Sequence, residues 1–302
     1  MKVIRALPFL IFIFLFNIKS EATHLMGSDM FYKHLGGMKY EVTVKYYRDC
    51  RGIPFAINNF TVSCSNGASR TVDLTLKSIK EITPLCPTES AKCTPQNVSN
   101  TGEGYEEHVY TAILDFGALP LSALASCTGD VVLATGQCCR NGAINTGPGG
   151  KYYTEALMKF DLTADSNSSP TFEIPPLIFT SINQPLHYAI GAVDTSDYDS
   201  LSFSFGQPLA EVSVPIGYDS GFAFNHPFSA YYPAGKSAPY SDPNANPPIG
   251  IYLDPTSGNL IGTPTVENQV TILVIVVKEW RKDSLGVYSN ISETRRDVQM
   301  IV

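Results

Sequence analysis

Apolar and polar residues alternate along several short stretches of the chain, which is the pattern of strands with one buried face. Between residues 40 and 46, tyrosine and valine take every second position and polar residues fill the positions between them. Val72, Leu74 and Leu76 repeat this pattern. Strand-type runs also cover residues 109–116, 156–162, 187–193, 201–205 and 249–253. Strong helical periodicity is absent, so the pattern predicts an all-β chain.

Residues 270–277 form a run in which both faces are apolar. Such a run predicts a central strand that is buried on both sides. Residues 283–286 then mark the turn of a hairpin, and residues 297–302 form a last strand. Because this strand reaches the final residue without a tail, we expect the sequence to be a fragment of a longer chain.

The stretch Asp165-Ser166-Asn167-Ser168-Ser169-Pro170 is the clearest candidate linker, because it is polar and ends in a residue that cannot continue a strand ladder. No cysteine follows it. The sequence therefore predicts two domains, residues 23–168 and 169–302. Short strands with regular turn signals predict two consecutive Ig-like β-sandwiches, the first of them stapled by disulfides.

The first 22 residues read as a signal peptide. Lys2 and Arg5 give a positive start, residues 6–18 are apolar, and Ser20-Glu21-Ala22 is a small-x-small cleavage pattern. The alternative is a membrane anchor, but the apolar run is short and no later segment offers about twenty apolar residues in a row. We therefore expect a secreted or outer-surface protein with no stable membrane span after cleavage.

The charge balance argues against a nucleic-acid partner. The formal net charge is −7. Cleavage after residue 22 removes three basic residues and one acidic residue, a net charge of +2, so the mature chain carries −9. Phosphate binding needs a basic face, and Arg295-Arg296 is the one basic cluster in the sequence.

All seven cysteines lie in the first half of the chain. Export predicts that they form a disulfide framework rather than reduced thiols. Because seven is odd, at least one is free, pairs between chains, or has lost its partner. A bridge such as Cys50 to Cys64 would contribute on the order of 3 kcal/mol in the chain-entropy model. The candidate disulfide residues are Cys50, Cys64, Cys86, Cys93, Cys127, Cys138 and Cys139.

Two of these cysteines, Cys138 and Cys139, are adjacent. Neighbouring cysteines rarely bridge each other, so we expect each to pair elsewhere, as a disulfide hub of the first sandwich. Arg140 and Asn141 are expected to serve the turn that leaves this hub. Cys86 and Cys93 lie in a loop rich in Pro, Thr, Ser and Asn, and a local bridge between them is expected to close it.

No combination of residues predicts catalysis. The stretch Gly217-Tyr218-Asp219-Ser220-Gly221 superficially resembles a protease serine loop, but a nucleophile elbow needs serine where Asp219 stands. The five histidines are scattered, and neither HExxH nor paired CxxC spacing occurs. The sequence therefore predicts a protein that is not an enzyme. A hydrolase or enzyme-accessory domain is the least favoured of three hypotheses.

Calcium is the one metal that the sequence favours. Asp194, Asp197 and Asp199 place three carboxylates within six residues ahead of a strand, and Ca²⁺ prefers such hard oxygen donors. The alternative is an Asp-rich turn between two strands that is solvated and free of metal. No other cofactor is expected.

Aromatic residues crowd the Pro- and Gly-rich segment 222–240. Phe222, Phe224, Tyr231 and Tyr232 are the candidate ligand-binding residues, since exposed rings suit a surface glycan or a protein ligand. The alternative is a long loop that packs on its own sandwich.

Several short strings resemble, in order, the N-terminal region of large secreted surface proteins of Bacteroidota, the gliding-motility-associated C-terminal-domain proteins. YRDC at 47–50 and CCRN at 138–141 are the strongest, and the others lie at 23–27, 85–87, 167–172, 199–201 and 253–258. The resemblance implies an extracellular Ig- or cadherin-like multidomain protein that the type IX system carries to the surface. It also implies a sorting domain and a cysteine near residues 179–185, neither of which this sequence has. The missing cysteine would leave one member of the Cys138-Cys139 pair unpaired, and the altered Asp turn at 194–199 departs from the family's DxDGD type.

The leading hypothesis is a non-enzymatic extracellular or cell-surface module, structural or adhesin-like, that mediates spacing and contact. The alternative is a carbohydrate-binding module that uses the aromatic loop 222–240. Expected partners are a surface glycan or protein ligand and further domains of a longer chain.

Overall fold

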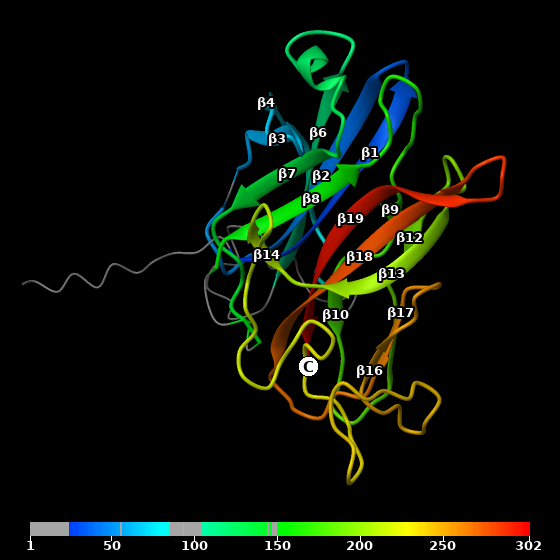
Figure 1. Cartoon of the computed structure of the whole chain (residues 1–302). Coiled ribbons are helices and arrows are strands. Elements are labelled where there is room, and N and C mark those ends of the chain that lie inside the picture. The colour runs from blue at the N-terminus through cyan, green and yellow to red at the C-terminus, as the bar shows by residue number, and fades with distance from the viewer. Residues whose placement is uncertain (1–23, 55, 85–92, 94–103, 144, 147–149) are drawn as a thin grey trace, which may run out of the picture.

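The computed structural model describes residues 24–54, 56–84, 93, 104–143, 145–146 and 150–302, and their chain is built from β-strands (Figure 1). The class is therefore all-β, as the alternating pattern predicts. The first half contains β1 Leu25–Gly36, β2 Lys39–Asp49, β3 Asn59–Cys64, β4 Ser69–Asp73, β5 Thr75–Glu81, β6 Tyr105–Asp115, the 3₁₀-helix η2 Leu121–Leu124, β7 Val131–Gln137 and β8 Tyr152–Met158. The second half contains β9 Thr171–Phe172, β10 Leu177–Phe179, β11 Leu186–Ala189, β12 Ala192–Val193, β13 Ser200–Gly206, β14 Leu209–Glu211, β15 Val214–Pro215, β16 Ile251–Leu253, β17 Asn259–Gly262, β18 Val270–Lys282 and β19 Tyr288–Ile301.

Nine strands pair in one antiparallel sheet, in the order β4-β3-β7-β8-β19-β1-β2-β6-β5. The strands at its two edges, β4 and β5, are consecutive in the chain and only Leu74 separates them. The sheet therefore curls until its edges nearly meet, which gives it a barrel-like form. Leu74 is buried at this corner, and its amide donates a hydrogen bond to the carbonyl of Asn58 at 2.8 Å.

This corner explains why the alternation around Val72, Leu74 and Leu76 is not one continuous strand. The chain leaves one edge of the sheet at Asp73 and joins the other edge at Thr75. Leu74 points into the core, whereas Leu76 is 47 % exposed on the edge strand β5. The predicted period of two therefore crosses from one edge to the other.

The last strand, β19, occupies a central place in the molecule. One of its edges pairs with β18 from Tyr288 to Ile301. Its other edge pairs in succession with β8 near Thr294, with β1 at Asp297, and in parallel with β10 from Gln299 onward. Figure 1 shows β18 and β19 side by side, with β19 next to β8 of the first half and β18 next to β13 of the second half. One strand thus belongs to both halves of the structure.

The described residues form two large hydrophobic cores, one in each half of the chain. The first is lined by strands of residues 25–162 and includes the alternating side chains of β2, which are fully buried from Tyr40 to Tyr46 at every second position. The second gathers residues from Phe172 to Met300, including the inner face of β18. The prediction of a central, doubly buried strand at 270–277 is confirmed, because β18 is buried between β13 and β19.

The prediction of two consecutive Ig-like sandwiches is wrong. A chain of two separate sandwiches would keep its sheets apart, whereas here β19 of the second half completes the sheet of the first half. Periodicity reports which face of a strand is buried, and it carries no information about which distant strand lies alongside. The division at residue 168 into segments 23–168 and 169–302 stays a prediction about folding units.

The predicted linker is a packed segment rather than an exposed one. Asn167, Ser168 and Ser169 are each less than 7 % exposed. The hydroxyl of Ser169 accepts the amide of Tyr32 at 2.9 Å, and the amide of Ser169 donates to the carbonyl of Tyr32 at 2.9 Å. The polar side chains that resemble a linker in the sequence therefore pair with β1.

A buried ion pair joins β1 to β19. Arg296 and Asp29 are both fully buried, and Nε of Arg296 lies 2.8 Å from Oδ1 of Asp29. The hydroxyl of Tyr47 donates to the same carboxylate at 2.9 Å, and the guanidinium stacks on the ring of Phe172 at 4.3 Å. Such a pair is tolerated in a core because each charge has several partners. It ties the first sheet to the second core.

Among the described residues, no helix is long or apolar enough to span a bilayer. Residues 1–22, predicted to be a signal peptide, lie outside the described residues.

Candidate functional site

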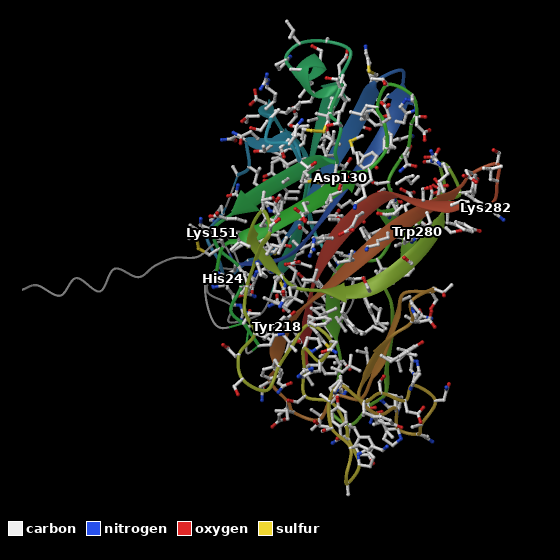
Figure 2. The ribbon with its side chains drawn as sticks, in the orientation of Figure 1. His24, Asp130, Lys151, Tyr218, Trp280 and Lys282 are labelled. Atoms are coloured by element: carbon white, nitrogen blue, oxygen red, sulfur yellow. A yellow bond between two sulfur atoms is a disulfide. The ribbon has the colours of Figure 1, made fainter. Side chains whose placement is uncertain are left out.

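Three carboxylates from distant parts of the chain meet at the outer end of β18. Oxygen atoms of Asp194, Asp199 and Glu279 all lie within 4.8 Å of one another. Asp194 and Asp199 come from the turn between β12 and β13, and Glu279 comes from β18. Figure 2 labels the neighbouring Trp280 and Lys282, toward the end of β18 that leads into the hairpin with β19. We name these three residues the carboxylate cluster.

Backbone hydrogen bonds fix the turn that carries the two aspartates. Oδ1 of Asp194 accepts the amides of Ser196 at 3.0 Å and Asp197 at 3.1 Å, and its Oδ2 accepts the amide of Asp199 at 2.5 Å. Tyr198 adopts a positive φ of 60° in this turn. The turn is therefore held in one conformation by its first side chain, in the manner of an Asx turn.

Arg281 and Asn167 surround the cluster. The guanidinium of Arg281 donates to Oδ2 of Asp199 at 2.6 Å and to Oδ1 of Asn167 at 2.6 Å. The amide nitrogen of Asn167 donates to Oε2 of Glu279 at 2.6 Å and to the hydroxyl of Tyr32 at 3.3 Å. These contacts connect the cluster to β1 through the packed segment at 167–169.

Burial changes the acidity of Glu279. Removal of the carboxylate from water raises its pKa to about 8, and the negative charges of Asp194 and Asp199 act in the same direction. The hydrogen bond from Asn167 opposes this shift. Arg281 sits beside Asp199, and hydrogen bonds and charge from that aspartate raise the pKa of the guanidinium against its burial. Glu279 is therefore a carboxyl that is hard to ionise without a cation close by.

The structure brings two of the three predicted calcium residues into the cluster and leaves the third outside it. Asp194 and Asp199 lie together in the cluster, whereas Oδ2 of Asp197 accepts the amide of Ser168 at 2.6 Å. Glu279 was missed because about eighty residues separate it from the aspartates in the sequence. The sequence carries no clear signal, because Glu279 follows the end of the apolar run at Val277 and has Lys278 beside it, so its full burial depends on the fold.

The adjacent cysteines do not pair with distant cysteines. Cys138 and Cys139 form a disulfide with each other, so the expectation of two separate bridges, and of an unpaired thiol in this pair, is wrong. The bridged pair lies beside the start of β1, where the amide of Leu25 donates to the carbonyl of Cys139 at 3.1 Å.

The two residues after this disulfide contact the distant strand β19 and do not serve only the local turn. Arg140 forms a buried ion pair with Asp297 of β19 and stacks on the ring of Tyr152 at 4.4 Å. The side-chain Nδ2 of Asn141 donates to Oε1 of Gln299 at 3.3 Å. The CCRN string therefore attaches the first half of the chain to the shared strand.

The remaining described cysteines pair over long distances. Cys50 pairs with Cys93, and Cys64 pairs with Cys127. The expected local bridge from Cys86 to Cys93 and a bridge from Cys50 to Cys64 are therefore both excluded. Cys86 lies outside the described residues. Three disulfides among the described residues are consistent with an extracellular protein.

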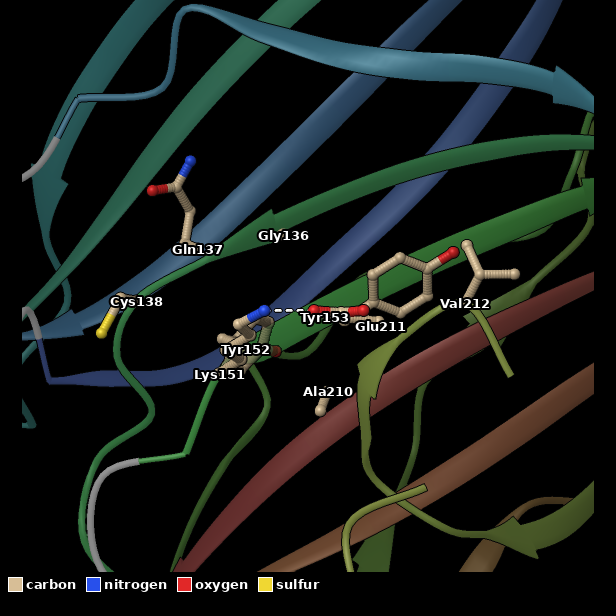
Figure 3. Close-up of a pocket in the computed structure, with 9 residues that line it drawn as sticks. All are labelled: Gly136, Gln137, Cys138, Lys151, Tyr152, Tyr153, Ala210, Glu211 and Val212. Carbon is tan, nitrogen blue, oxygen red and sulfur yellow. Dashed lines mark hydrogen bonds and ion pairs between the residues drawn. The ribbon is translucent and has the colours of Figure 1, made fainter. Parts of the chain in front are cut away.

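A hollow of about 410 Å³ lies between the ends of β7 and β8 and the strand β14 (Figure 3). Cys138 and Tyr153 line it, and an ion pair between Lys151 and Glu211 spans it. The hydrogen bond from Lys151 lowers the pKa of Glu211. Because these two exposed charges neutralise each other, the hollow offers a contact surface and no activated acid or base.

The four predicted aromatic residues do not form one platform. Phe224 is 42 % exposed and lines a second hollow of about 450 Å³, together with the ion pair between Arg295 and Glu155. Phe222, Tyr231 and Tyr232 are half-buried. Tyr231 exchanges backbone hydrogen bonds with Thr263 and Gly250, so its segment packs on the second half of the protein.

The stretch 217–221 is an exposed loop. The amide of Asp219 donates to the carbonyl of Asn145 at 2.8 Å, and the carbonyl of Asp219 accepts the amide of Phe222 at 3.0 Å. Ser220 is exposed on this loop. A nucleophile elbow connects a strand to a helix, and this loop does not.

Comparison with known proteins found no matching family model, no matching curated protein and no matching solved structure. The resemblance to the Bacteroidota surface proteins therefore remains an expectation.

Proposed function

We propose that the chain is a non-enzymatic extracellular module of an adhesin-like surface protein, which holds a defined spacing and offers surfaces for contact. The observation that carries this proposal is the shared strand β19, because it completes the sheet of the first half while its Val298 and Met300 pack in the core of the second half. A body built in this way resists bending between its halves, and stiffness is what a spacer requires.

The use of the polar motif residues supports the same function. Arg140, Asn141 and Asn145 all reach strands of the second half, and Asn145 mimics a strand residue by exchanging hydrogen bonds with the backbone of Ile272 at 2.6 and 3.1 Å. These groups are buried and paired. Their work is to fasten parts of the chain together rather than to act on a substrate.

The test displays the chain on a bacterial surface and measures retention under flow on immobilised glycoproteins and polysaccharides, with product release assayed in parallel. We expect retention without release of any hydrolysis product. A Lys39→Met variant, which alters only the exposed ion pair with Asp115, should be retained equally. Product release that scales with protein and disappears in an Asp219→Asn or Ser220→Ala variant would overturn the proposal.

A carbohydrate-binding module is the second candidate, and the exposed ring of Phe224 in the hollow at Arg295 favours it. Sugar sites combine an aromatic face with a few fixed polar groups, and Arg295 is held by Glu155 at 3.0 Å. A glycan array separates the candidates. Selective binding that is lost in Phe224→Ala and kept in Tyr240→Ala would support this function, because Tyr240 is an equally exposed ring outside the hollow.

A further inference from the structure

Glu279 is a buried carboxylate, and only one of its two oxygens accepts a hydrogen bond from the described residues. The residue is fully buried, and its Oε2 accepts the Asn167 amide. Oε1 has no hydrogen-bond partner among the described residues. The hydroxyl of Ser292, on the paired strand β19, lies close enough to lower the pKa of Glu279, but it also lacks a hydrogen bond of normal geometry. Burying such an oxygen without a partner is unfavourable, which points to a further group at this site.

The spacing of the carboxylate cluster fits one ion. Oxygens of Asp194, Asp199 and Glu279 lie within 4.8 Å of one another. Ca²⁺ binds oxygens at about 2.3–2.6 Å, so two of its ligands are at most roughly 5 Å apart. A single cation can therefore contact all three carboxylates with small side-chain movements.

The charges around the cluster are not balanced by the protein. Arg281 forms ion pairs with Asp199, Asp165 and Asp197. Among the described residues, Asp194 and Glu279 form no ion pair. Each carboxylate oxygen has more than one acceptor position, so Asp199 can keep its contact with Arg281 and still contact an ion.

We propose that Asp194, Asp199 and Glu279 bind a divalent cation through their carboxylate oxygens, with calcium as the preferred ion. The cluster contains no imidazole or thiolate, which disfavours zinc and copper. Asp194 and Asp199 are partly exposed, so water completes the six to eight ligands that Ca²⁺ takes. Few protein ligands indicate a dissociation constant of about 10⁻⁴–10⁻³ M, the range of extracellular modules.

This site goes beyond the proposed spacing function, because it makes the packing at the end of β18 depend on an ion. The cation would link the β12–β13 turn to β18 and, through Asn167, to Tyr32 of β1.

The experiment titrates CaCl₂ into the purified full chain by calorimetry, followed by terbium luminescence sensitised by Trp280, the only tryptophan. We expect one saturable site, terbium emission that calcium displaces, and binding at least tenfold weaker in Glu279→Gln and in Asp194→Asn. Asp197→Asn separates this site from the simple Asp-rich turn, because it should retain the wild-type affinity. Glu267→Gln, which removes an exposed acid elsewhere, is the matched charge control.

The proposal is overturned if the wild-type protein shows neither saturable heat nor displaceable terbium emission with CaCl₂ up to about 10 mM, whatever the variants do. Equal weakening in Glu267→Gln would show diffuse charge attraction and would overturn it as well. Binding that is lost in Asp197→Asn and kept in Glu279→Gln would also overturn the proposal, because the ion would then bind to the turn alone. Magnesium binding as tight as calcium binding would overturn the stated preference. Because retention under flow is measured separately, failure here leaves the spacing function standing.

Discussion

Replacing Arg140 by methionine tests whether the two cores unfold as one unit. The substitution keeps most of the apolar stem and removes the charge that faces Asp297. The side chains of this ion pair are only 3 % and 5 % exposed, and Asp297 has no other ion pair among the described residues. Removing one member of a buried pair typically destabilises by about 3–5 kcal/mol, because the other charge stays buried alone.

The lost stacking of the guanidinium on Tyr152, at 4.4 Å, adds to this figure, and packing of methionine recovers part of it. We therefore expect a loss of about 4 kcal/mol, a large part of the roughly 5–15 kcal/mol that a folded domain has. The double variant Arg140→Met, Asp297→Leu should recover most of the loss, since it leaves no charge unpaired. Lys151→Met breaks a pair whose side chains are 64 % and 58 % exposed, so it should leave the free energy of unfolding almost unchanged.

The assay is urea unfolding at pH 7, followed by far-UV circular dichroism and by the fluorescence of Trp280. That tryptophan lies on β18 in the second half, where its Nε1 donates to Ser202 at 2.8 Å. Because Arg140 belongs to the first half, we expect both signals to shift by the same amount. A loss no larger than that of Lys151→Met would refute the burial argument. A tryptophan transition that stays in place while the dichroism shifts would refute the single unit.

Two further predictions concern the first half. The Cys64–Cys127 bridge spans a sequence separation of 63, so Cys64→Ala with Cys127→Ala should lose about 4 kcal/mol of unfolding free energy in urea; a loss below about 1 kcal/mol would contradict this. The hydrogen bond with His108 lowers the pKa of Glu106, so its ionised form stabilises the fold above its ordinary pKa of 4.5, and this contribution disappears as the pH falls through the lowered value. The stability advantage of wild type over Glu106→Gln should therefore shrink between pH 7 and pH 3, and an advantage that is unchanged with pH would contradict this reasoning.

Local patterns predicted the strands well because burial of one face is a local property. The alternation at 40–46 corresponds to β2, and the doubly apolar run at 270–277 corresponds to β18 between two neighbours. The hairpin turn at Asp283 is also confirmed, since its amide donates to the carbonyl of Val287 at 2.9 Å. Each of these features depends on residues that are close in the sequence.

The sheet order and the disulfide pairing depend on contacts across long stretches of chain, which periodicity does not encode. The position of β19 between β8 and β1 is one such contact. The pairing of Cys50 with Cys93 is another. The carboxylate cluster is intermediate, because the aspartates were visible as a turn while Glu279 joins them only through the fold. Glu279 lies beyond the apolar run 270–277 and beside Lys278, so its burial is determined by the fold and not by the local pattern.

The place of β19 also determines when the molecule can be finished during its synthesis. Without residues 288–301, the nine-strand order separates into the pieces β4-β3-β7-β8 and β1-β2-β6-β5, which then lose their pairing through the sheet and keep contacts such as that of Leu25 with Cys139. A ribosome makes the segment that fills this gap after all the other described strands. The nine-strand order can therefore be completed only after residues 288–301 have been synthesised, however early the first strands pair.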